Sequence, residues 1–304
     1  ESIAKMRAAD EAGNSPFDLI DAEGPDAQRA CDEGLATEIN FDAALAPGDD
    51  GSTPTADFGP SLINACFVPQ IVFSTTFGYR NDVAAWNGAV PTSLCDVFDT
   101  TKFPGKRSLE KRPKKNLEWA LICDGVAKDD LYTVLSSDGG VERALAKLDT
   151  IKSDVVWWSA GAETPQLLAD GEVVFGSTYN GRLFSVIEEQ KQPVSMLWDW
   201  QGFDFDGWIV PTGLDKARMN RTMHFLRFAT DTQRLADQAK YIAYGPARAS
   251  SQPLVGKHAT LGIDMAPQMP TNPANKKNFL VNNIEWWADN ADEVEVKFQN
   301  WLSK

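Results

Sequence analysis

The chain has 304 residues, of which 43% are hydrophobic and 24% are charged, and its formal net charge at pH 7 is −14. This length suffices for one large α/β domain or for two lobes that each bury a core. The negative charge argues against a nucleic acid or an anionic membrane surface as partner, and no apolar stretch approaches the roughly 20 residues of a membrane span.

The first part of the chain alternates helix and strand patterns. Apolar residues at helical spacing predict a helix that ends at Gly13, and Phe17 to Ile20 is predicted to be a short buried strand. A second helix is predicted over 26–33, because a glycine follows it as a C-terminal stop. The stretch 67–77 is β-branched and aromatic but contains Pro69, so we predict two short strands there.

The rest of the chain continues this alternation. A β-helix-β unit is predicted over 150–185, and a strand with an acidic midpoint over 203–211. Helices are predicted over 117–123, 141–148, 217–229, 231–241 and 284–301. Helices that alternate with short strands indicate an α/β fold with mostly parallel sheets.

Two changes of composition, near residues 77–82 and 204–211, predict crossings between two lobes. The N-terminal lobe would then contain residues 1–80 and 206–250, and the C-terminal lobe residues 81–205 and 251–304. Discontinuous lobes of this kind are typical of hinge proteins, whose ligand lies in a cleft between the lobes.

Four cysteines, Cys31, Cys66, Cys95 and Cys123, are widely spaced and form no Cys-x-x-Cys pair. This spacing disfavours a zinc ribbon or thioredoxin-like chemistry. The even number suits two disulfides in an oxidising compartment, although four buried thiols in a cytosolic protein would give the same sequence. If disulfides form, sequence order favours Cys31 with Cys66 in one lobe and Cys95 with Cys123 in the other.

Six segments carry a family resemblance by occurring together in one order. They are Phe17-Asp18-Leu19-Ile20-Asp21, Ala30-Cys31-Asp32-Glu33-Gly34-Leu35, Phe77-Gly78-Tyr79-Arg80-Asn81-Asp82, Phe103-Pro104-Gly105-Lys106-Arg107, a Trp-Trp and Asn-Gly block over 155–182, and Tyr244-Gly245-Pro246. With them the chain resembles the spermidine/putrescine-like periplasmic solute-binding proteins of ABC importers. The resemblance implies an α/β, two-lobe periplasmic-binding-protein fold of type II, with the ligand cleft between lobes joined by crossover hinge strands.

The resemblance also implies a function and a location. The protein would bind a small molecule in the periplasm and deliver it to the membrane permease of an ABC importer, as a monomer, without a cofactor, a metal or a nucleic acid. The sequence begins at Glu1 with no charged-then-apolar leader, which fits a cytosolic protein or a mature secreted one. Relatives begin with a further strand and turn, so we expect that segment and any signal peptide to lie outside this numbering.

Asp206 stands where polyamine-binding relatives set an acidic residue against a ligand ammonium. A carboxylate in a water-poor cleft is unfavourable unless a cation pairs with it; the alternative is that Asp206 only hydrogen-bonds a hinge turn. Asp204 is the weaker candidate, since strand alternation is expected to send it to the opposite face. Glu23, in the turn after the first strand, would add a second acceptor.

Aromatic residues are expected to form the walls of the site. Tyr179 stands where relatives stack a ring on the ligand, and an aromatic face attracts a desolvated ammonium by about 0.5–2 kcal/mol. Because neighbouring strand residues point oppositely, one of Trp157 and Trp158 faces the cleft, and we favour Trp158. Thr75 and Thr76 would supply hydroxyls.

Arg182 distinguishes this chain from relatives that bind only polyamines, because a guanidinium beside the ligand repels cations and suits a carboxylate. Arg112 and Lys115 fall near the positions where polyamine binders place acidic residues. The basic island over 101–116 that contains them is explained as well by a solvated face or a contact for the importer. Arg182 with Asp206 predicts a zwitterionic ligand, either an ω-amino acid such as γ-aminobutyrate or a betaine-like compound, with a polyamine as the alternative.

The sequence provides little for an enzyme. His224 and His258 are the only histidines, so a histidine metal site or a Ser-His-Asp triad is poorly supplied. There is no G-x-S-x-G motif, phosphate-binding loop or dinucleotide fingerprint. Two rivals stay open: a glycosidase with an Asp/Glu pair among the tryptophans, and a neutral-sugar importer protein, against which Arg182 argues.

Overall fold

The structure is a computed structural model that describes residues 2–304, and the chain divides into two compact units. Unit 1 comprises Glu1–Phe73 and Asp204–Met269, and unit 2 comprises Ser74–Phe203 and Pro270–Lys304. The predicted lobes differ most at residues 251–269, which belong to unit 1. A hydrogen bond of 2.8 Å from Ala259 N to Lys240 O ties this segment to the helical part of unit 1.

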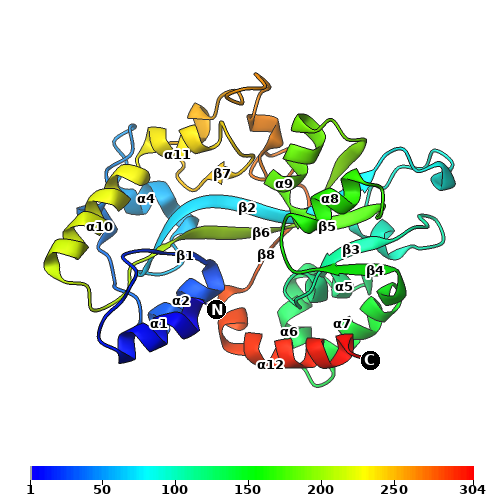
Figure 1. The fold of residues 1–304 in the computed structure, drawn as a ribbon, viewed down its shortest axis with the longest axis horizontal. Helices are drawn as coiled ribbons and strands as arrows, with labels where there is room; N and C mark the ends of the chain where they lie inside the picture. Colours follow the sequence, from blue (N-terminus) through cyan, green and yellow to red (C-terminus); the bar gives the residue numbers. More distant parts are fainter. Residues whose placement is uncertain (1) are drawn as a thin grey trace. The chain divides into compact units, whose positions relative to one another are not determined.

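Both units are mixtures of helices and strands (Figure 1). Unit 1 contains α1 (Ser2–Glu11), β1 (Ile20–Glu23), α2 (Gly24–Asp32), α3 (Phe41–Ala44), α4 (Pro54–Phe58), α10 (Lys216–Ala229), α11 (Thr232–Gln238), β7 (Gly245–Pro246), and short 3-10 helices at Gly59–Ser61, Gln252–Leu254 and Ala266–Gln268. The strands β2 (Phe67–Arg80) and β6 (Val194–Ile209) each contain a change from one unit to the other.

Unit 2 contains more elements than unit 1. Its helices are α5 (Asn116–Cys123), α6 (Leu131–Leu135), α7 (Gly140–Asp149), α8 (Glu163–Ala169), α9 (Asn180–Phe184), α12 (Ile284–Leu302), a π-helical turn at Ser185–Glu189, and 3-10 helices at Ala84–Trp86, Leu94–Phe98, Lys128–Asp130 and Lys152–Asp154. Its further strands are β3 (Arg107–Glu110), β4 (Val155–Trp158), β5 (Phe175–Tyr179) and β8 (Phe279–Val281).

In unit 2 the strand β3 is parallel to both β4 and β5, and β5 is antiparallel to β2. A large apolar core on one face joins these strands to α5, α7 and α12, and a smaller one on the other face joins them to α8 and α9 (Figure 1). Because helices cover both faces, the edges of the sheet are left to carry polar side chains.

In unit 1, β1 is antiparallel to β6, and β7 is antiparallel to β2. The prediction of two strands separated by Pro69 is wrong, because β2 is continuous over 14 residues. Proline has an extended backbone that fits a strand, and it removes only one hydrogen-bond donor from the ladder. Gly207 of β6 allows the two strands to come close beside this proline, because a Cβ on it would lie 2.4 Å from Val68 O of β2.

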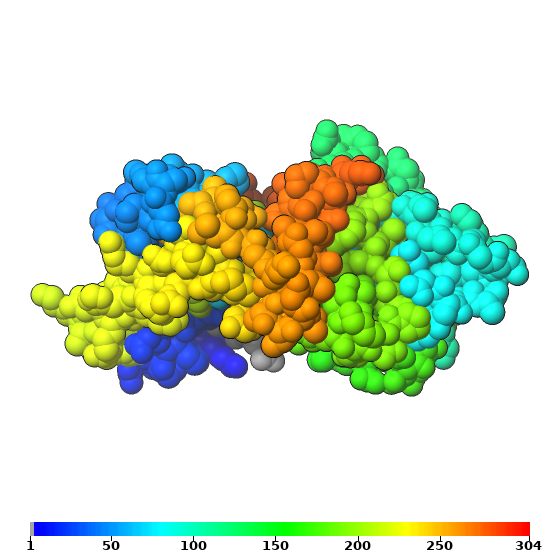
Figure 2. Space-filling view, turned by 90° about the horizontal axis from the view of Figure 1, so that it is seen from above, coloured from blue at the N-terminus to red at the C-terminus, as the bar shows by residue number. Residues whose placement is uncertain are grey.

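Seven predicted helices are confirmed as α1, α2, α5, α7, α10, α11 and α12. Three of them begin at residues that suit an N-cap: Asp215 accepts hydrogen bonds from two backbone N–H groups of α10, Asp231 accepts one from α11, and Asn283 accepts one from α12. Helix α10 lies on the outside of unit 1 (Figure 2), where Phe225 and Phe228 are exposed. The strand predicted at Phe17 begins later, at Ile20, because residues 15–17 form a hydrogen-bonded turn.

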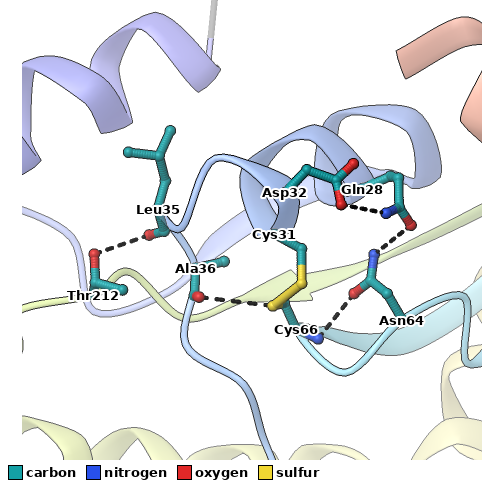
Figure 3. Close-up of a disulfide and its surroundings, with 8 residues drawn as sticks. All are labelled: Gln28, Cys31, Asp32, Leu35, Ala36, Asn64, Cys66 and Thr212. Carbon is teal, nitrogen blue, oxygen red and sulfur yellow. Dashed lines mark hydrogen bonds between the residues drawn. A yellow bond between two sulfur atoms is a disulfide. The ribbon is translucent and has the colours of Figure 1, made fainter. Parts of the chain in front are cut away.

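Two disulfides confirm the predicted pairing, and each lies within one unit. Cys31 in α2 bonds to Cys66 just before β2, with Cα atoms 5.7 Å apart. Around this bond, Cys66 N donates to Asn64 Oδ1 at 2.9 Å and Asn64 Nδ2 donates to Gln28 Oε1 at 3.0 Å (Figure 3). Cys95 bonds to Cys123 at the end of α5, with Cα atoms 5.3 Å apart.

Within residues 2–304, the structure contains no helix with the length and apolar character needed to cross a membrane.

Candidate functional site

Four acidic residues of unit 1 share one face of the antiparallel pair of β1 and β6. Glu23 lies directly opposite Asp206, and Asp21 and Asp204 are each two residues from one of these. Strand residues two apart point to the same face, and the other face of the pair packs into the apolar core of unit 1. We refer to Asp21, Glu23, Asp204 and Asp206 as the acidic face.

Burial and repulsion between neighbouring carboxylates raise the pKa of two members of the acidic face, Asp206 and Asp21. Burial is the largest cause that raises the pKa of Asp206 to about 8, and repulsion from Asp21 and then Glu23 adds to it. Burial also raises the pKa of Asp21, whereas a hydrogen bond with Asp206 lowers it. A cation bound here would relieve the repulsion and favour the ionised carboxylates.

The prediction that strand alternation separates Asp204 from Asp206 is wrong. The two residues are two apart, so they share a face, and the charge of Asp204 adds to the raised pKa of Asp206. Asp204 is only 2% exposed. Asp21 is a member of this face that no sequence pattern singled out: its spacing of two places it on the same strand face as Glu23, but only the pairing of β1 with β6 brings that face to Asp206.

Most of the other candidates lie at one edge of the sheet of unit 2. Because β3 is parallel to β4 and β5, the carboxyl ends of the three strands meet there. Trp158 ends β4, Tyr179 ends β5, and Thr75 of β2 lies opposite Tyr179. Arg112 follows β3, and Arg182 lies in α9 directly after β5. Ligands of open α/β sheets bind outside the carboxyl ends of strands.

The two adjacent tryptophans have different surroundings. Trp157 packs edge-on against Phe298 and Trp301 of α12, with ring centroids 5.7 and 5.8 Å apart. Trp158 is 1% exposed and lies edge-to-face with Tyr179, with ring centroids 6.0 Å apart. Trp157 therefore belongs to the core, and Trp158 is the tryptophan that accompanies Tyr179.

The loop between β4 and α8 is held close to Tyr179. Glu163 Oε1 accepts the backbone N–H of Ala160 at 2.7 Å, and Thr178 Oγ1 donates to Gly161 O at 3.1 Å. A Cβ on Gly161 would lie 2.8 Å from Cε2 of the Tyr179 ring. The absence of a side chain at Gly161 thus fixes how close the loop and the ring come.

Replacing Gly161 with alanine is expected to displace the Tyr179 ring, because a methyl group added to filled space forces shifts that typically lower stability by about 1–3 kcal/mol. The affinity for the ligand should fall as a result. Isothermal titration calorimetry with the solute that stabilises the wild-type protein measures the loss. Gly256→Ala is the matched control, because a Cβ there meets nothing within 4 Å. Equal affinity of the Gly161 variant and the wild type would show that Tyr179 does not contact the ligand.

The two arginines at this edge differ in their partners. Arg112 Nε lies 2.7 Å from Oε1 of Glu110, so its charge is already paired within unit 2. The side chain of Arg182 is exposed and makes no hydrogen bond or ion pair with any residue of the described range 2–304. Its planar guanidinium is therefore available for a bidentate contact with an anion.

The explanation of the basic island as a solvated face is wrong for its buried members. Arg107 is 0% exposed, and its guanidinium donates to the carbonyls of Val97 at 2.9 Å and Phe103 at 2.6 Å. Lys115 is 3% exposed, and its Nζ donates to Phe203 O at 3.2 Å. Arg107 thus ties β3 to the segment that precedes it, and Lys115 ties the start of α5 to β6.

Within residues 2–304, no group of three histidine, cysteine, aspartate or glutamate side chains is placed to hold a metal ion. The two histidines lie on separate elements. His224 is exposed on α10, whereas His258 is buried, and its Nδ1 accepts the N–H of Leu261 at 3.2 Å.

The architecture defines the class of protein. Two discontinuous α/β units, with two strands that run from one unit into the other, are the features of the two-lobe periplasmic binding proteins. Residues 1–271 match the family of bacterial extracellular solute-binding proteins. The chain belongs to this family. Solute-binding proteins of ABC importers bind small solutes and deliver them to membrane permeases.

Individual proteins of known name are similar to the chain. The chain is 34% identical over 304 residues to the gamma-aminobutyric acid-binding protein of Pseudomonas aeruginosa, which covers 99% of this chain and 80% of that protein. A solved GABA receptor is 31% identical, with a TM-score of 0.83 over 99% of this chain and 86% of that one. The spermidine/putrescine-binding protein PotD of Streptococcus pneumoniae shares the fold, with a TM-score of 0.72 over 99% of this chain and 89% of that one at 13% identity. The predicted resemblance to this group of solute-binding proteins is confirmed.

Proposed function

We propose that the protein is the periplasmic binding subunit of an ABC importer and that its solute is γ-aminobutyrate or a closely similar zwitterion. One observation carries the proposal: unit 1 has an acidic face that a bound cation would stabilise, and unit 2 has an exposed cation that a bound anion would stabilise. Unit 1 has the acidic face, on which the pKa of Asp206 is raised to about 8, and unit 2 has the exposed Arg182 without a partner in residues 2–304. A solute with an ammonium and a carboxylate would satisfy both.

Different residues would bind the two ends of the solute. Asp206, with Glu23 beside it, would accept hydrogen bonds from the ammonium, and Arg182 would donate two to the carboxylate. Tyr179 would cover the methylene groups, with the Thr75 hydroxyl nearby. We propose that the protein, as a monomer, delivers the bound solute to the membrane permease of the importer. No bond is made or broken, so no catalytic residue is needed.

The names of two relatives support this choice of solute. The gamma-aminobutyric acid-binding protein and the GABA receptor are each more than 30% identical to the chain over nearly all of its length. Arg112 is left out of the proposed contacts because Glu110 already neutralises it.

A thermal-shift screen tests the proposal. The protein, produced under oxidising conditions so that both disulfides form, is heated with γ-aminobutyrate, a betaine, putrescine and a neutral sugar in turn. A ligand at a hundred times its dissociation constant adds about 2.7 kcal/mol to the free energy of unfolding, so γ-aminobutyrate should raise the melting temperature clearly. Stabilisation by putrescine alone would contradict the zwitterion, and stabilisation by the sugar alone would contradict amine binding altogether.

A further inference from the structure

One buried hydrogen-bond donor of unit 2 has nothing to donate to. Trp158 is 1% exposed, and its Nε1 finds no acceptor among residues 2–304. Buried donors are nearly always paired, and each exception calls for an explanation. Tryptophan offers only a donor, so the missing partner must be an acceptor.

Other tryptophans of the same chain show how unusual this is. Five of them donate their indole N–H to an acceptor at 2.7–3.0 Å. These are Trp86, Trp119, Trp286, Trp287 and Trp301. The fold therefore supplies acceptors for indole groups that only hold the core together, and it supplies none for Trp158.

The surroundings of Trp158 are also not those of a core residue. Although it is among the largest fully buried side chains, it belongs to none of the four apolar clusters of the described residues, whereas Trp157 packs against one of them. Its ring meets Tyr179 edge to face at the end of β5, and Arg182 follows three residues later. Trp158 thus lies at the carboxyl edge of the sheet, and α9 with Arg182 begins directly after β5 at the same edge.

We propose that the indole N–H of Trp158 donates a hydrogen bond to the carboxylate of the bound solute, so that Trp158 acts through its nitrogen and not as an aromatic wall for an ammonium. This inference rests on the proposed function, since it needs a solute with a carboxylate. A donor-only group accepts no hydrogen bond from a second ammonium, so Trp158 would select a zwitterion over a diamine. In this proposal the Arg182 guanidinium supplies the positive charge for the carboxylate, and the indole N–H of Trp158 orients the carboxylate through a directional hydrogen bond.

Trp158→Phe tests the proposal, because phenylalanine keeps an aromatic ring but removes the N–H. Calorimetry should show affinity for γ-aminobutyrate that is about 10- to 100-fold weaker, the range for a lost hydrogen bond to a charged group. Trp157→Phe is the matched control: it trims a ring that packs on α12, so it should lower the melting temperature and leave the affinity unchanged. Affinity of the Trp158 variant within about twofold of the wild type would overturn the proposal.

A second measurement needs no variant and covers the case in which Trp158→Phe does not fold. In a ¹⁵N-labelled wild-type protein, the Trp158 indole N–H resonance, assigned through its contact with Tyr179, should move downfield when γ-aminobutyrate is added. A resonance that does not move would mean that the N–H faces the Tyr179 ring or a water, and it would overturn the proposal. Failure of the proposed function gives a different result, because the wild type itself would then bind putrescine or a sugar and no zwitterion. In that case the solute has no carboxylate, so a contact between Trp158 and a carboxylate is excluded as well.

Discussion

Replacing Asp206 with asparagine is expected to weaken the binding of γ-aminobutyrate by about 30-fold to several thousandfold, because the ligand ammonium loses its charged acceptor. Removing one partner of a buried, hydrogen-bonded charge pair typically changes the binding free energy by about 2–5 kcal/mol. The unliganded protein should not lose stability, since burial and acidic neighbours already disfavour the carboxylate that asparagine replaces. Calorimetry at pH 8 measures the affinity, and thermal unfolding measures the stability.

The dependence on pH gives Asp206 a signature that a merely structural residue would lack. Its pKa is raised to about 8, so below that pH the neutral acid must release a proton before it pairs with an ammonium. The affinity of the wild type should therefore rise by up to roughly tenfold per pH unit and level off above pH 8. The stability of the unliganded protein depends on pH in the opposite direction. The folded protein binds the Asp206 proton more tightly than the unfolded chain does, so the free energy of unfolding falls as pH rises from about 4 to about 8.

Asp21→Asn is the matched control for this experiment. Asp21 is the neighbour whose charge contributes most to the raised pKa of Asp206. Its removal should lower the pKa of Asp206 and shift the rise in affinity to lower pH, with little change in affinity at pH 8. A wild-type affinity that stays flat through the pKa of Asp206, together with an unchanged Asp206→Asn variant, would contradict the assignment of Asp206 to the ammonium.

The helices and disulfides of this protein were largely predictable because their signals are local. Helix α10 follows Asp215, whose side chain caps it, and α12 follows Asn283 in the same way. Cysteine order sufficed for the pairing because each disulfide closes a short segment within one unit. Signals of this kind lie within a few residues or within one part of the chain, so they can be recognised without knowledge of the fold.

Strand register and the burial of charge were not predictable in the same way. The acidic face exists because β1 pairs with β6 so that Glu23 meets Asp206, and no local pattern shows which strands pair. Asp21 joined the face only through this register. In the same way, nothing in a run of basic residues shows that Arg107 is fully buried among backbone carbonyls while Lys106 beside it stays exposed.

Replacing Arg182 with alanine is expected to reverse the preference between γ-aminobutyrate and putrescine, which carries an ammonium in place of the carboxylate. The variant should bind γ-aminobutyrate at least about 30-fold more weakly, because the carboxylate loses its charged donor. It should bind putrescine more tightly than the wild type does, because the repulsion between guanidinium and ammonium is gone. Parallel titrations with the two compounds measure the change in ratio.

Stability should not obscure this result. Arg182 is exposed and has no partner in the described residues, so its removal should change the free energy of unfolding by no more than about 0.5 kcal/mol. Arg182→Lys keeps the charge but loses the planar fork, and it should give an intermediate affinity for γ-aminobutyrate. Arg221→Ala, an exposed arginine on α10 of unit 1, is the matched control and should change neither affinity. If Arg182→Ala behaved like Arg221→Ala, Arg182 would not contact the solute, and the choice between a zwitterion and a polyamine would depend on Trp158.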